Sequence, residues 1–378
     1  MAARELPLKN LWEALGATFK TEKDWEIVSI FKEFLYEYTA VRKGVGLIDE
    51  STRGKIKVTG KDRISFLHNI LTNDIQRLSI GDGCYAALLS AAGKVLADMG
   101  VYVFPNFVLL ELETGLEKKL MGLISKYIVQ EDVKLEDVTE EYALLSLQGP
   151  RSEALAQVVF PGPFPELANR QHVNFHAGDV EVTLIRLSRT GENGYGLLVP
   201  RLEANELAER ILIVGKLYGL RPVGFGASEI LRIEAGILRY GVDMDEEMTL
   251  PETGLEEIAA SETKGCYPGQ EVVARTKTYG GLNRKVTGLI FEKGLLPAGG
   301  DKIYSREAAP AGGTASEKEI GRVTSACISP RLNKGIAIGI VAKGFFEKPS
   351  EVEIKISNGE IIASTTTLPF KLLPFVSS

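Results

Sequence analysis

The sequence predicts an α+β protein that ends in a small β-barrel domain. Over residues 1–284, paired strand-like runs with turns between them alternate with amphipathic helices, which is typical of α+β domains rather than of repeated βαβ units. From residue 285 to 378 the chain has short apolar runs broken by Gly, Pro and Ser and no long helical pattern, which favours a small barrel. We therefore expect a first region, 1–284, made of two similar α+β subdomains, and a C-terminal domain, 285–378.

The first predicted helix covers residues 22–44. Its apolar residues recur at about the helical spacing of 3.6, with Thr21 as a candidate cap and Gly44 as a stop. These apolar positions are Ile27, Ile30, Phe31, Phe34 and Leu35.

The other elements follow from alternation, apolar runs and turn residues. Strands are expected at 55–58, 85–89, 95–104, 107–112, 142–148, 180–188 and 195–199, and helices at 61–69, 116–128, 152–160, 202–218 and 228–235. In the C-terminal domain the expected strands are 286–291, 320–328, 335–341 and 351–356, with a long loop at 294–316.

Composition excludes several classes of protein. The chain of 378 residues is 44% hydrophobic and 25% charged, as in ordinary globular proteins, and its net charge of −6 argues against a nucleic-acid partner. No apolar run approaches the roughly 20 residues of a membrane span, so no membrane partner is expected. Residues 1–9 lack the apolar segment of a signal peptide, and a cytoplasmic location is the expectation that follows.

The cysteines and histidines do not form an evident metal site or disulfide framework. Three widely spaced cysteines with no C-x-x-C pair predict free thiols, and Cys84 and Cys327 lie in apolar surroundings typical of structural residues. His172 and His176 have the i, i+4 spacing of helical metal ligands, but their segment reads as strand and turn. We therefore predict no metal site.

The segment Lys-Gly-Cys-Tyr-Pro-Gly-Gln-Glu at 264–271 is the strongest local signal for chemistry. A lysine beside Cys266 favours the reactive thiolate, and glycines allow a tight turn close to a neighbour. Read alone, the segment indicates a functional thiol that acts as a nucleophile; the alternative is an inert buried cysteine. The residues expected to support the thiol are Lys264, Gly265, Gly269, Gln270 and Glu271.

Four further motifs, in this order along the chain, resemble those of one superfamily. They are Phe-Leu-His-Asn-Ile-Leu-Thr-Asn-Asp at 66–74, Thr-Gly-Glu-Asn-Gly-Tyr at 190–195, Leu-Arg-Ile-Glu-Ala-Gly at 231–236 and Tyr-Gly-Val-Asp-Met-Asp-Glu at 240–246. On these the chain is similar to the folate-binding proteins related to glycine-cleavage aminomethyltransferase, the T-protein, over about residues 30–375. The resemblance implies an aminomethyltransferase-like folate-binding fold and tetrahydrofolate, or a one-carbon derivative of it, as cofactor.

The 264–271 segment resembles the signature of the YgfZ branch of this superfamily. That branch implies a tetrahydrofolate-binding accessory protein for iron–sulfur cluster assembly or repair. Such a protein supports iron–sulfur enzymes, for example those that modify tRNA. The implied partners are iron–sulfur assembly proteins or client proteins. The transferases instead have an acidic pair, for which this chain has Ala97 and Asp98. The sequence therefore favours the accessory role, with Cys266 and Asp98 as the candidate catalytic residues. The alternative is a tetrahydrofolate-dependent aminomethyltransferase, so whether the chain is an enzyme stays open.

Three residues are expected to bind the folate by this resemblance. Glu192, on a turn between strands, would accept hydrogen bonds from the pterin, or else is a solvated turn residue. The transferases have an acidic residue where this chain has Gly196, which leaves Glu192 as the candidate in that turn. Arg232 would bind a carboxylate of the glutamate tail, or else holds its helix through a buried ion pair. Tyr85 matches an aromatic residue near the transferase cofactor, or else packs in the core.

Overall fold

The computed structural model describes residues 3–306 and 318–370 and divides into two compact units. The first comprises 1–89, 96–229 and 258–268, and the second comprises 90–95, 230–257 and 269–378, as far as these residues are described. The division predicted from the sequence, at residues 284 and 285, stays a prediction. No helix within the described ranges is long and apolar enough to cross a membrane.

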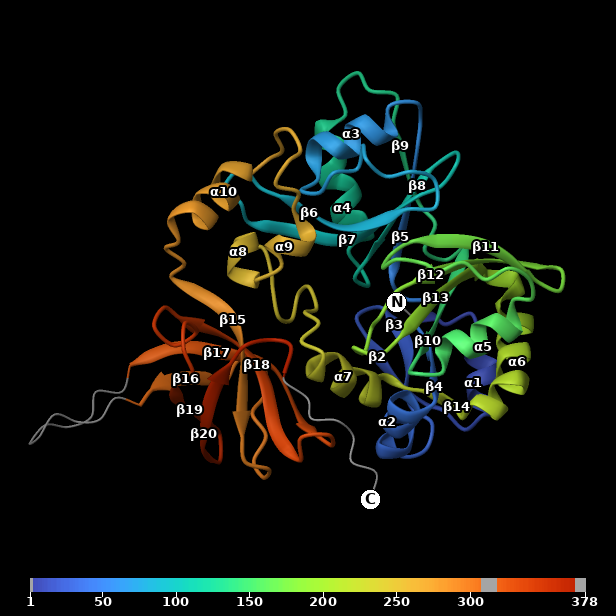
Figure 1. Cartoon of the computed structure of the whole chain (residues 1–378). Helices are drawn as coiled ribbons and strands as arrows, with labels where there is room; N and C mark the ends of the chain where they lie inside the picture. The colour runs from blue at the N-terminus through green and yellow to red at the C-terminus, as the bar shows by residue number, and fades with distance from the viewer. Residues whose placement is uncertain (1–2, 307–317, 371–378) are drawn as a thin grey trace, which may run out of the picture. The chain divides into compact units, whose positions relative to one another are not determined.

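A six-stranded sheet and a five-stranded sheet form the body of the first unit (Figure 1). The larger has the order β11-β12-β13-β10-β4-β14, in which only β14 and β4 pair in parallel. Its strands are β4 (Val45–Asp49), β10 (Tyr142–Gln148), β11 (His172–Ala177), β12 (Val180–Arg186), β13 (Gly194–Pro200) and β14 (Leu220–Val223). The smaller has the order β6-β7-β8-β5-β9, with β5 (Gly54–Thr59), β6 (Gly83–Leu89), β7 (Val95–Val103), β8 (Val108–Leu112) and β9 (Lys134–Asp137).

Helices cover the outer face of each sheet, and the two inner faces pack on each other. One core lies between the six-stranded sheet and helices α1 (Lys9–Ala14), α5 (Ser152–Val159) and α6 (Ala204–Gly215). A second lies between the five-stranded sheet and α3 (Arg63–Ile70) and α4 (Glu117–Ile124). A third, smaller core joins Tyr102 and Leu109 of one sheet to Leu144, Ile185 and Leu198 of the other. The short helices η1 (Ser125–Tyr127), η2 (Arg201–Glu203) and η3 (Lys216–Tyr218) extend α4 and α6.

The helix predicted over 22–44 is wrong in its first half. There β2 (Thr18–Glu22) and β3 (Trp25–Ile30) form an antiparallel hairpin, which β1 (Arg4–Glu5) completes, and the helix α2 begins only at Phe34 (Phe34–Lys43). The turn between β2 and β3 is Lys23-Asp24, with Lys23 at φ 55°, so the usual glycine signal for a two-residue hairpin is missing. Trp25, Ile27 and Val28 have the aromatic and β-branched side chains that favour strands. Gly44 ends α2 as predicted.

The second unit contains a closed six-stranded barrel, as predicted, with the order β15-β18-β17-β16-β19-β20 (Figure 1). Its strands are β15 (Arg284–Phe291), β16 (Lys302–Ser305), β17 (Glu319–Ser329), β18 (Lys334–Ala342), β19 (Glu351–Ile356) and β20 (Gly359–Thr366). The loop predicted at 294–316 is wrong where β16 lies, and 307–317 is outside the described residues. The unit also holds α8 (Leu250–Thr253) and α10 (Gln270–Tyr279), while α7 (Phe225–Glu234) and α9 (Glu256–Ala259) run across the division between units.

Candidate functional site

The strand β7 presents a carboxylate on the inner face of the five-stranded sheet. Successive side chains of a strand point to opposite faces. Ala97 and Met99 lie in the core beneath α3 and α4, whereas Tyr102 lies in the core between the sheets. Asp98 is on the same face as Tyr102 and accepts a hydrogen bond at Oδ2 from the Tyr85 hydroxyl of β6, at 2.7 Å. The structure thus brings together two of the predicted site residues, Tyr85 and Asp98.

The other oxygen of Asp98, Oδ1, is buried and lacks a hydrogen-bond partner among the described residues. Burial raises the pKa of Asp98, while the Tyr85 hydrogen bond and the charge of Arg53 oppose that rise. Burial also raises the pKa of Tyr85 well above its ordinary value, so Tyr85 stays a neutral donor. A buried polar atom without a partner costs free energy, so a ligand that hydrogen-bonds to Oδ1 gains that amount.

Ala97 stands where the resemblance gives the transferases the first residue of their acidic pair. It does not alter the inner face of the sheet, which carries Asp98. Ala97 is 2% exposed and packs beneath the helices, on the opposite face from Asp98. A carboxylate at position 97 would therefore point away from Tyr85. The argument against aminomethyl transfer that rested on Ala97 loses its force.

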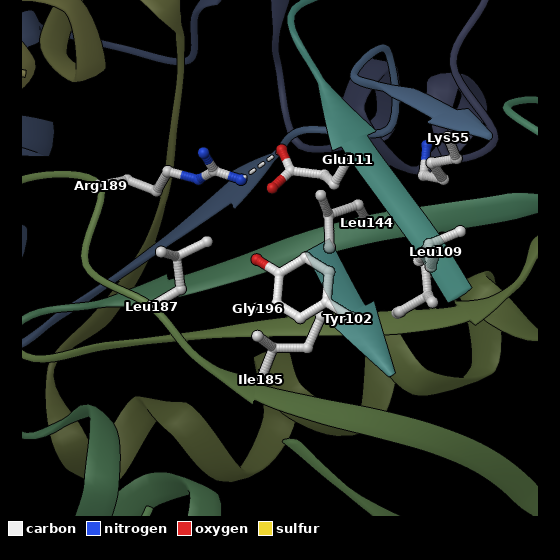
Figure 2. Close-up of a pocket in the computed structure, with 10 residues that line it drawn as sticks. Lys55, Tyr102, Leu109, Glu111, Leu144, Ile185, Leu187, Arg189 and Gly196 are labelled. Carbon is white, nitrogen blue, oxygen red and sulfur yellow. Dashed lines mark hydrogen bonds and ion pairs between the residues drawn. The ribbon is translucent and has the colours of Figure 1, made fainter. Parts of the chain in front are cut away.

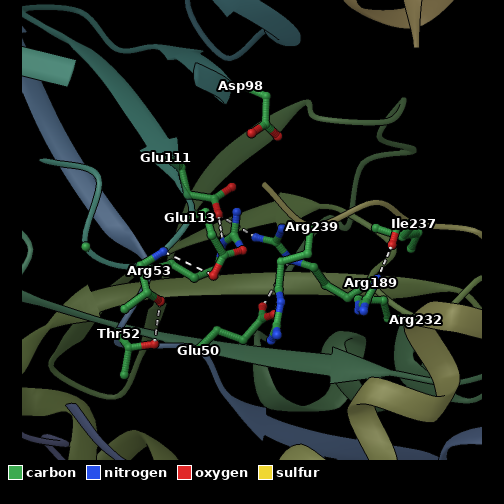
Figure 3. Close-up of polar contacts among 12 residues, drawn as sticks. Glu50, Thr52, Arg53, Asp98, Glu111, Glu113, Arg189, Arg232, Ile237 and Arg239 are labelled. Carbon is green, nitrogen blue, oxygen red and sulfur yellow. Dashed lines mark hydrogen bonds and ion pairs between the residues drawn. The ribbon is translucent and has the colours of Figure 1, made fainter. Parts of the chain in front are cut away.

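A network of charged residues lies on the same side of this sheet (Figure 3). Glu111 of β8 is 4% exposed and pairs with Arg53 and, at 2.7 Å, with Arg189. Arg53 also pairs with Glu113 at 3.1 Å, and Arg189 pairs with Glu50 at 3.1 Å. Although burial opposes it, the charges of Arg189 and Arg53 hold the pKa of Glu111 well below its usual range. The ion pairs therefore join these three carboxylates and two guanidinium groups into one network.

A small cavity lies between the two sheets next to this network (Figure 2). Its volume of about 10 Å³ has room for one water at most, so it cannot hold a pterin. Tyr102, Glu111, Arg189 and Gly196 contribute to its wall. A Cβ atom at Gly196 would meet only ordinary contacts, 3.6 Å from Leu144 and 3.8 Å from Ile185. A Cβ here is therefore tolerated, and the position that the resemblance gives to an acidic residue in the transferases lies in the wall of this cavity.

Glu192 follows β12 on the turn before β13 and pairs with Arg42. The Glu192 Oε1 atom lies 2.7 Å from Nη1 of Arg42, whose side chain is 2% exposed. Arg42 also donates to the carbonyl of Thr190 in the same turn. The ion pair connects this turn to the last turn of α2. Glu192 is therefore held by a partner and is not a freely solvated turn residue. Its role toward a folate stays a prediction.

Arg232 belongs to the second unit and lies in a buried polar cluster. Its guanidinium donates to Asp243 at 2.6 Å, to the carbonyl of Ile237 at 2.9 Å (Figure 3) and to the hydroxyl of Ser325 at 2.9 Å. Asp243 is fully buried and also accepts from Thr324 and Ser325 of β17. These contacts favour the reading in which Arg232 holds its helix, and a part in binding a folate carboxylate stays a prediction.

Lys264 does not have the surroundings that its place beside Cys266 suggested. Its Nζ donates to the carbonyl oxygens of His68 and Leu71, and to that of Asn73 at 3.2 Å. Lys264 therefore binds carbonyls of the last turn of α3, of its C-cap Leu71 and of the segment that follows. Burial lowers the pKa of Lys264 to about 8. Its contacts make it an anchor for the loop that carries Cys266.

Cys266 is exposed, and the neighbouring Tyr267 is 7% exposed. Gly269 has φ 78°, and a Cβ there would lie 2.5 Å from the carbonyl oxygen of Ser90, so this position requires glycine. Gly265 has no such restriction, because a Cβ there meets nothing within 4 Å. Gln270 and Glu271 begin α10. Cys84 is half-buried, with its pKa raised by burial to about 12, and Cys327 is buried, so both are placed as structural residues.

Comparison with known proteins decides the family. Residues 8–262 match the GCVT N-terminal domain, and residues 284–371 match the glycine cleavage T-protein C-terminal barrel domain. The chain belongs to the glycine cleavage T-protein family. This confirms the predicted superfamily and fold, while no match distinguishes the YgfZ branch within it. Tetrahydrofolate, the predicted cofactor, is the one-carbon carrier of this family.

Individual members of the family match over almost the whole chain. An aminomethyltransferase of Thermoanaerobacter sp. (strain X514) is 30% identical over 94% of this chain and 94% of that protein. One of Bacillus licheniformis is 30% identical over 97% and 98%. The crystal structure of the glycine cleavage system aminomethyltransferase T from Bartonella henselae has a TM-score of 0.85 at 25% identity and covers 98% of each chain.

Several residues of the site escaped the sequence reasoning. Arg53, Glu111 and Arg189 are separated by tens of residues in the chain, and their pairing depends on how the sheets pack. The one available signal was a glutamate in the otherwise apolar run Val108–Leu112. Among the described residues no group of three His, Cys, Asp or Glu could hold a metal ion.

Proposed function

We propose that this protein is a tetrahydrofolate-dependent transferase that moves a one-carbon unit from an aminomethyl donor on a carrier protein. The observation that carries the proposal is Asp98, whose Oδ2 is held by Tyr85 while its buried Oδ1 lacks a partner among the described residues. Membership of a family whose matched relatives are named aminomethyltransferases supports it. Because this reading rests on Asp98 rather than on an acidic pair, Ala97 does not weigh against it.

The residues of the chain fit an amine-bearing ligand next to Asp98. Tetrahydrofolate, when bound, supplies the amine nitrogens that take up the one-carbon unit. An orphaned carboxylate oxygen is an acceptor of the kind that N–H groups require. Tyr85 and Glu192, both in the first unit, are the residues proposed to hold the folate, Tyr85 by its ring and Glu192 by its charge.

Asp98 is proposed to act in its ionised form. A carboxylate attracts a protonated amine more strongly in surroundings that exclude water than the same carboxylate does in water. Oδ1 would hold the ammonium group of the aminomethyl donor. On transfer, the bond from the carbon to this nitrogen breaks and ammonia leaves. The bond from the carbon to the carrier also breaks, and the carrier atom takes up a proton that the folate amines release as they bond the carbon. Tyr85 keeps the carboxylate from rotating, because its hydroxyl occupies Oδ2. Oriented groups of this kind contribute through proximity and electrostatic stabilisation.

The test is transfer by the purified protein from an aminomethylated carrier to tetrahydrofolate. We expect turnover by the wild-type chain. Asp98→Asn keeps the shape and the Tyr85 acceptor but removes the charge, so it should lower kcat about 10²- to 10⁴-fold. Asp179→Asn, in an exposed turn, is the control and should match wild type. Absence of wild-type turnover, or full activity of Asp98→Asn, would contradict the proposal.

A second candidate is the accessory role in iron–sulfur cluster assembly or repair, and the exposed thiol of Cys266 favours it. One cysteine cannot hold a cluster alone, so any cluster would be shared with a partner or transient. Cys266→Ser and Asp98→Asn separate the candidates. If transfer is the function, Cys266→Ser retains turnover and Asp98→Asn loses it. If the accessory role is the function, Cys266→Ser fails to restore iron–sulfur enzyme activity in cells that lack the protein.

A further inference from the structure

Arg170 lies against the Tyr85–Asp98 pair and comes from a segment that no motif marked. Its guanidinium carbon is 4.9 Å from the centroid of the Tyr85 ring, and its Nη1 lies 3.2 Å from the Tyr102 hydroxyl. A cation over an aromatic face is attracted by about 1 kcal/mol, and more where water is excluded. The Arg170 side chain is half-buried, so this contact is shielded from the full effect of solvent.

The backbone holds Arg170 in a conformation that side-chain-bearing residues seldom adopt. Its φ is 68°, in the left-handed region. Its N–H donates to the carbonyl of Arg186 at 2.6 Å, and the next residue, Gln171, donates through its side chain to Asp82 at 2.9 Å. Residues that their surroundings hold in a strained backbone conformation occur often at functional sites, and Arg170 is such a residue.

Two glycines leave the space that Arg170 occupies. A Cβ at Gly100, which lies between Asp98 and Tyr102 on β7, would be 2.9 Å from Nη1 of Arg170. A Cβ at Gly83, near the start of β6, would be 2.6 Å from the Arg170 carbonyl oxygen. A Cβ at either position would also lie 2.8 Å from the Tyr102 ring, so the two glycines leave room for Tyr102 and Arg170 together on the strands that carry Tyr85 and Asp98.

We infer that Arg170 is a positioning residue for the Tyr85–Asp98 pair. Its guanidinium rests on the Tyr85 ring and directs the Tyr85 hydroxyl at Oδ2 of Asp98, which leaves Oδ1 for the substrate. A cation over a phenol ring also makes the hydroxyl a stronger donor, and a stronger hydrogen bond favours the ionised carboxylate. The inference rests on the proposed function, since it assigns Asp98 the reacting role.

Other charged side chains near Tyr85 and Asp98 also shift the pKa values of these two groups. Arg53 lowers and Glu113 raises the pKa of Asp98, and Arg170 and Arg53 both lower the pKa of Tyr85. Loss of Arg170 weakens the Tyr85 donor and therefore raises the pKa of Asp98, which burial has already raised. Because the ionised form is the active one, the acid limb of the pH profile should move to higher pH.

The experiment compares Arg170→Met, Arg170→Lys and the control Arg221→Met in the full-length protein. Arg221 is a matched control because its guanidinium carbon also lies over a tyrosine ring, 5.3 Å from the centroid of Tyr36. Two readouts are used: the pH dependence of kcat/KM, and titration of the Asp98 carboxyl by ¹³C NMR, assigned with Asp98→Asn. We expect Arg170→Met to raise the pKa of Asp98 by about half to one unit, and to lower kcat about tenfold with KM within about twofold. Arg170→Lys should recover part of both effects, and Arg221→Met should change neither.

The NMR readout keeps the inference separate from the proposed function. An unchanged Asp98 titration in Arg170→Met overturns the inference, whether or not the protein turns over folate. Equal loss of activity in Arg170→Met and Arg170→Lys without a shift of the pH profile also overturns it, because that is the result of a purely structural role. A shifted titration in a protein that shows no transfer sustains the inference about the pair and overturns only the proposed function.

Discussion

Glu111 shows at the scale of one residue how this fold keeps charges inside it. Its carboxylate compensates two buried guanidinium groups, Arg53 and Arg189. Removal of one partner from a buried ion pair is costly, because the charge left behind has no compensation. Glu111→Gln leaves each guanidinium with one carboxylate in place of two, Glu113 for Arg53 and Glu50 for Arg189. We therefore expect a loss at the lower end of the range for a broken buried pair, about 3 kcal/mol in unfolding free energy at pH 7, measured by urea denaturation. Glu319→Gln, which breaks the exposed pair with Lys302, should cost about 0.5 kcal/mol or less.

The same substitution predicts a pH dependence. The pKa of Glu111 is depressed in the folded protein, so its contribution to stability is complete above its unfolded pKa and is lost as pH falls toward the folded value. The stability difference between wild type and Glu111→Gln should therefore shrink as pH falls below about 4.5. A difference that stayed constant from pH 7 to pH 3 would show that Glu111 acts by packing alone.

At the scale of an element, β13 contains two glycines with opposite roles. A Cβ at Gly194 would lie 2.2 Å from the Gln148 amide nitrogen, and Gln148 is fully buried. Gln148 cannot move away without losing its bonds to the Ser146 hydroxyl and the Leu187 carbonyl. We expect Gly194→Ala to cost about 2 to 3 kcal/mol. Gly196→Ala meets no clash and should gain about 0.5 kcal/mol by reducing the freedom of the unfolded chain. Thermal unfolding of the two variants gives the comparison, and equal effects would contradict it.

Prediction from sequence succeeded where an element carries its own signal. The apolar run 142–148 coincides with β10, and the boundaries of β18 and β19 were found to within a residue or two, because runs bounded by turn residues identify buried strands. The hairpin β2–β3 was missed because Lys23-Asp24 lacks a glycine and the apolar spacing fits a helix as well. Asp98 and Tyr85 were predicted as site residues through motif and family resemblance, and the structure shows that they are hydrogen-bonded to each other. Arg170 and the partners of Glu111 could not be, because their contacts depend on packing between distant segments.

At the scale of the whole molecule, the barrel has the properties of an independently folding part. It is closed, so it leaves no open strand edge, and it has its own core, which includes Leu289, Val323 and Ile354. A register shift between Val323 and Ser325 in β17 accompanies a second set of contacts. There Thr324 and Ser325 donate to the buried Asp243, which precedes the barrel in the chain. The helical segment before the barrel should therefore add to its stability.

Two fragments test this expectation. Fragment 283–370 contains the barrel strands, and fragment 230–370 adds Arg232 and Asp243. We expect both to give a β-sheet circular dichroism spectrum and a cooperative thermal transition. The longer fragment should be more stable by about 2 kcal/mol, because buried hydrogen bonds to the charged Asp243 contribute free energies of this order. Asp243→Asn in the longer fragment should remove most of that gain. Asp245→Asn, whose pair with Arg322 is 3.4 Å long and partly exposed, should keep it. An unfolded short fragment would show that closure and core do not suffice, and equal stability of the two fragments would show that the Arg232–Asp243 cluster contributes nothing to the barrel.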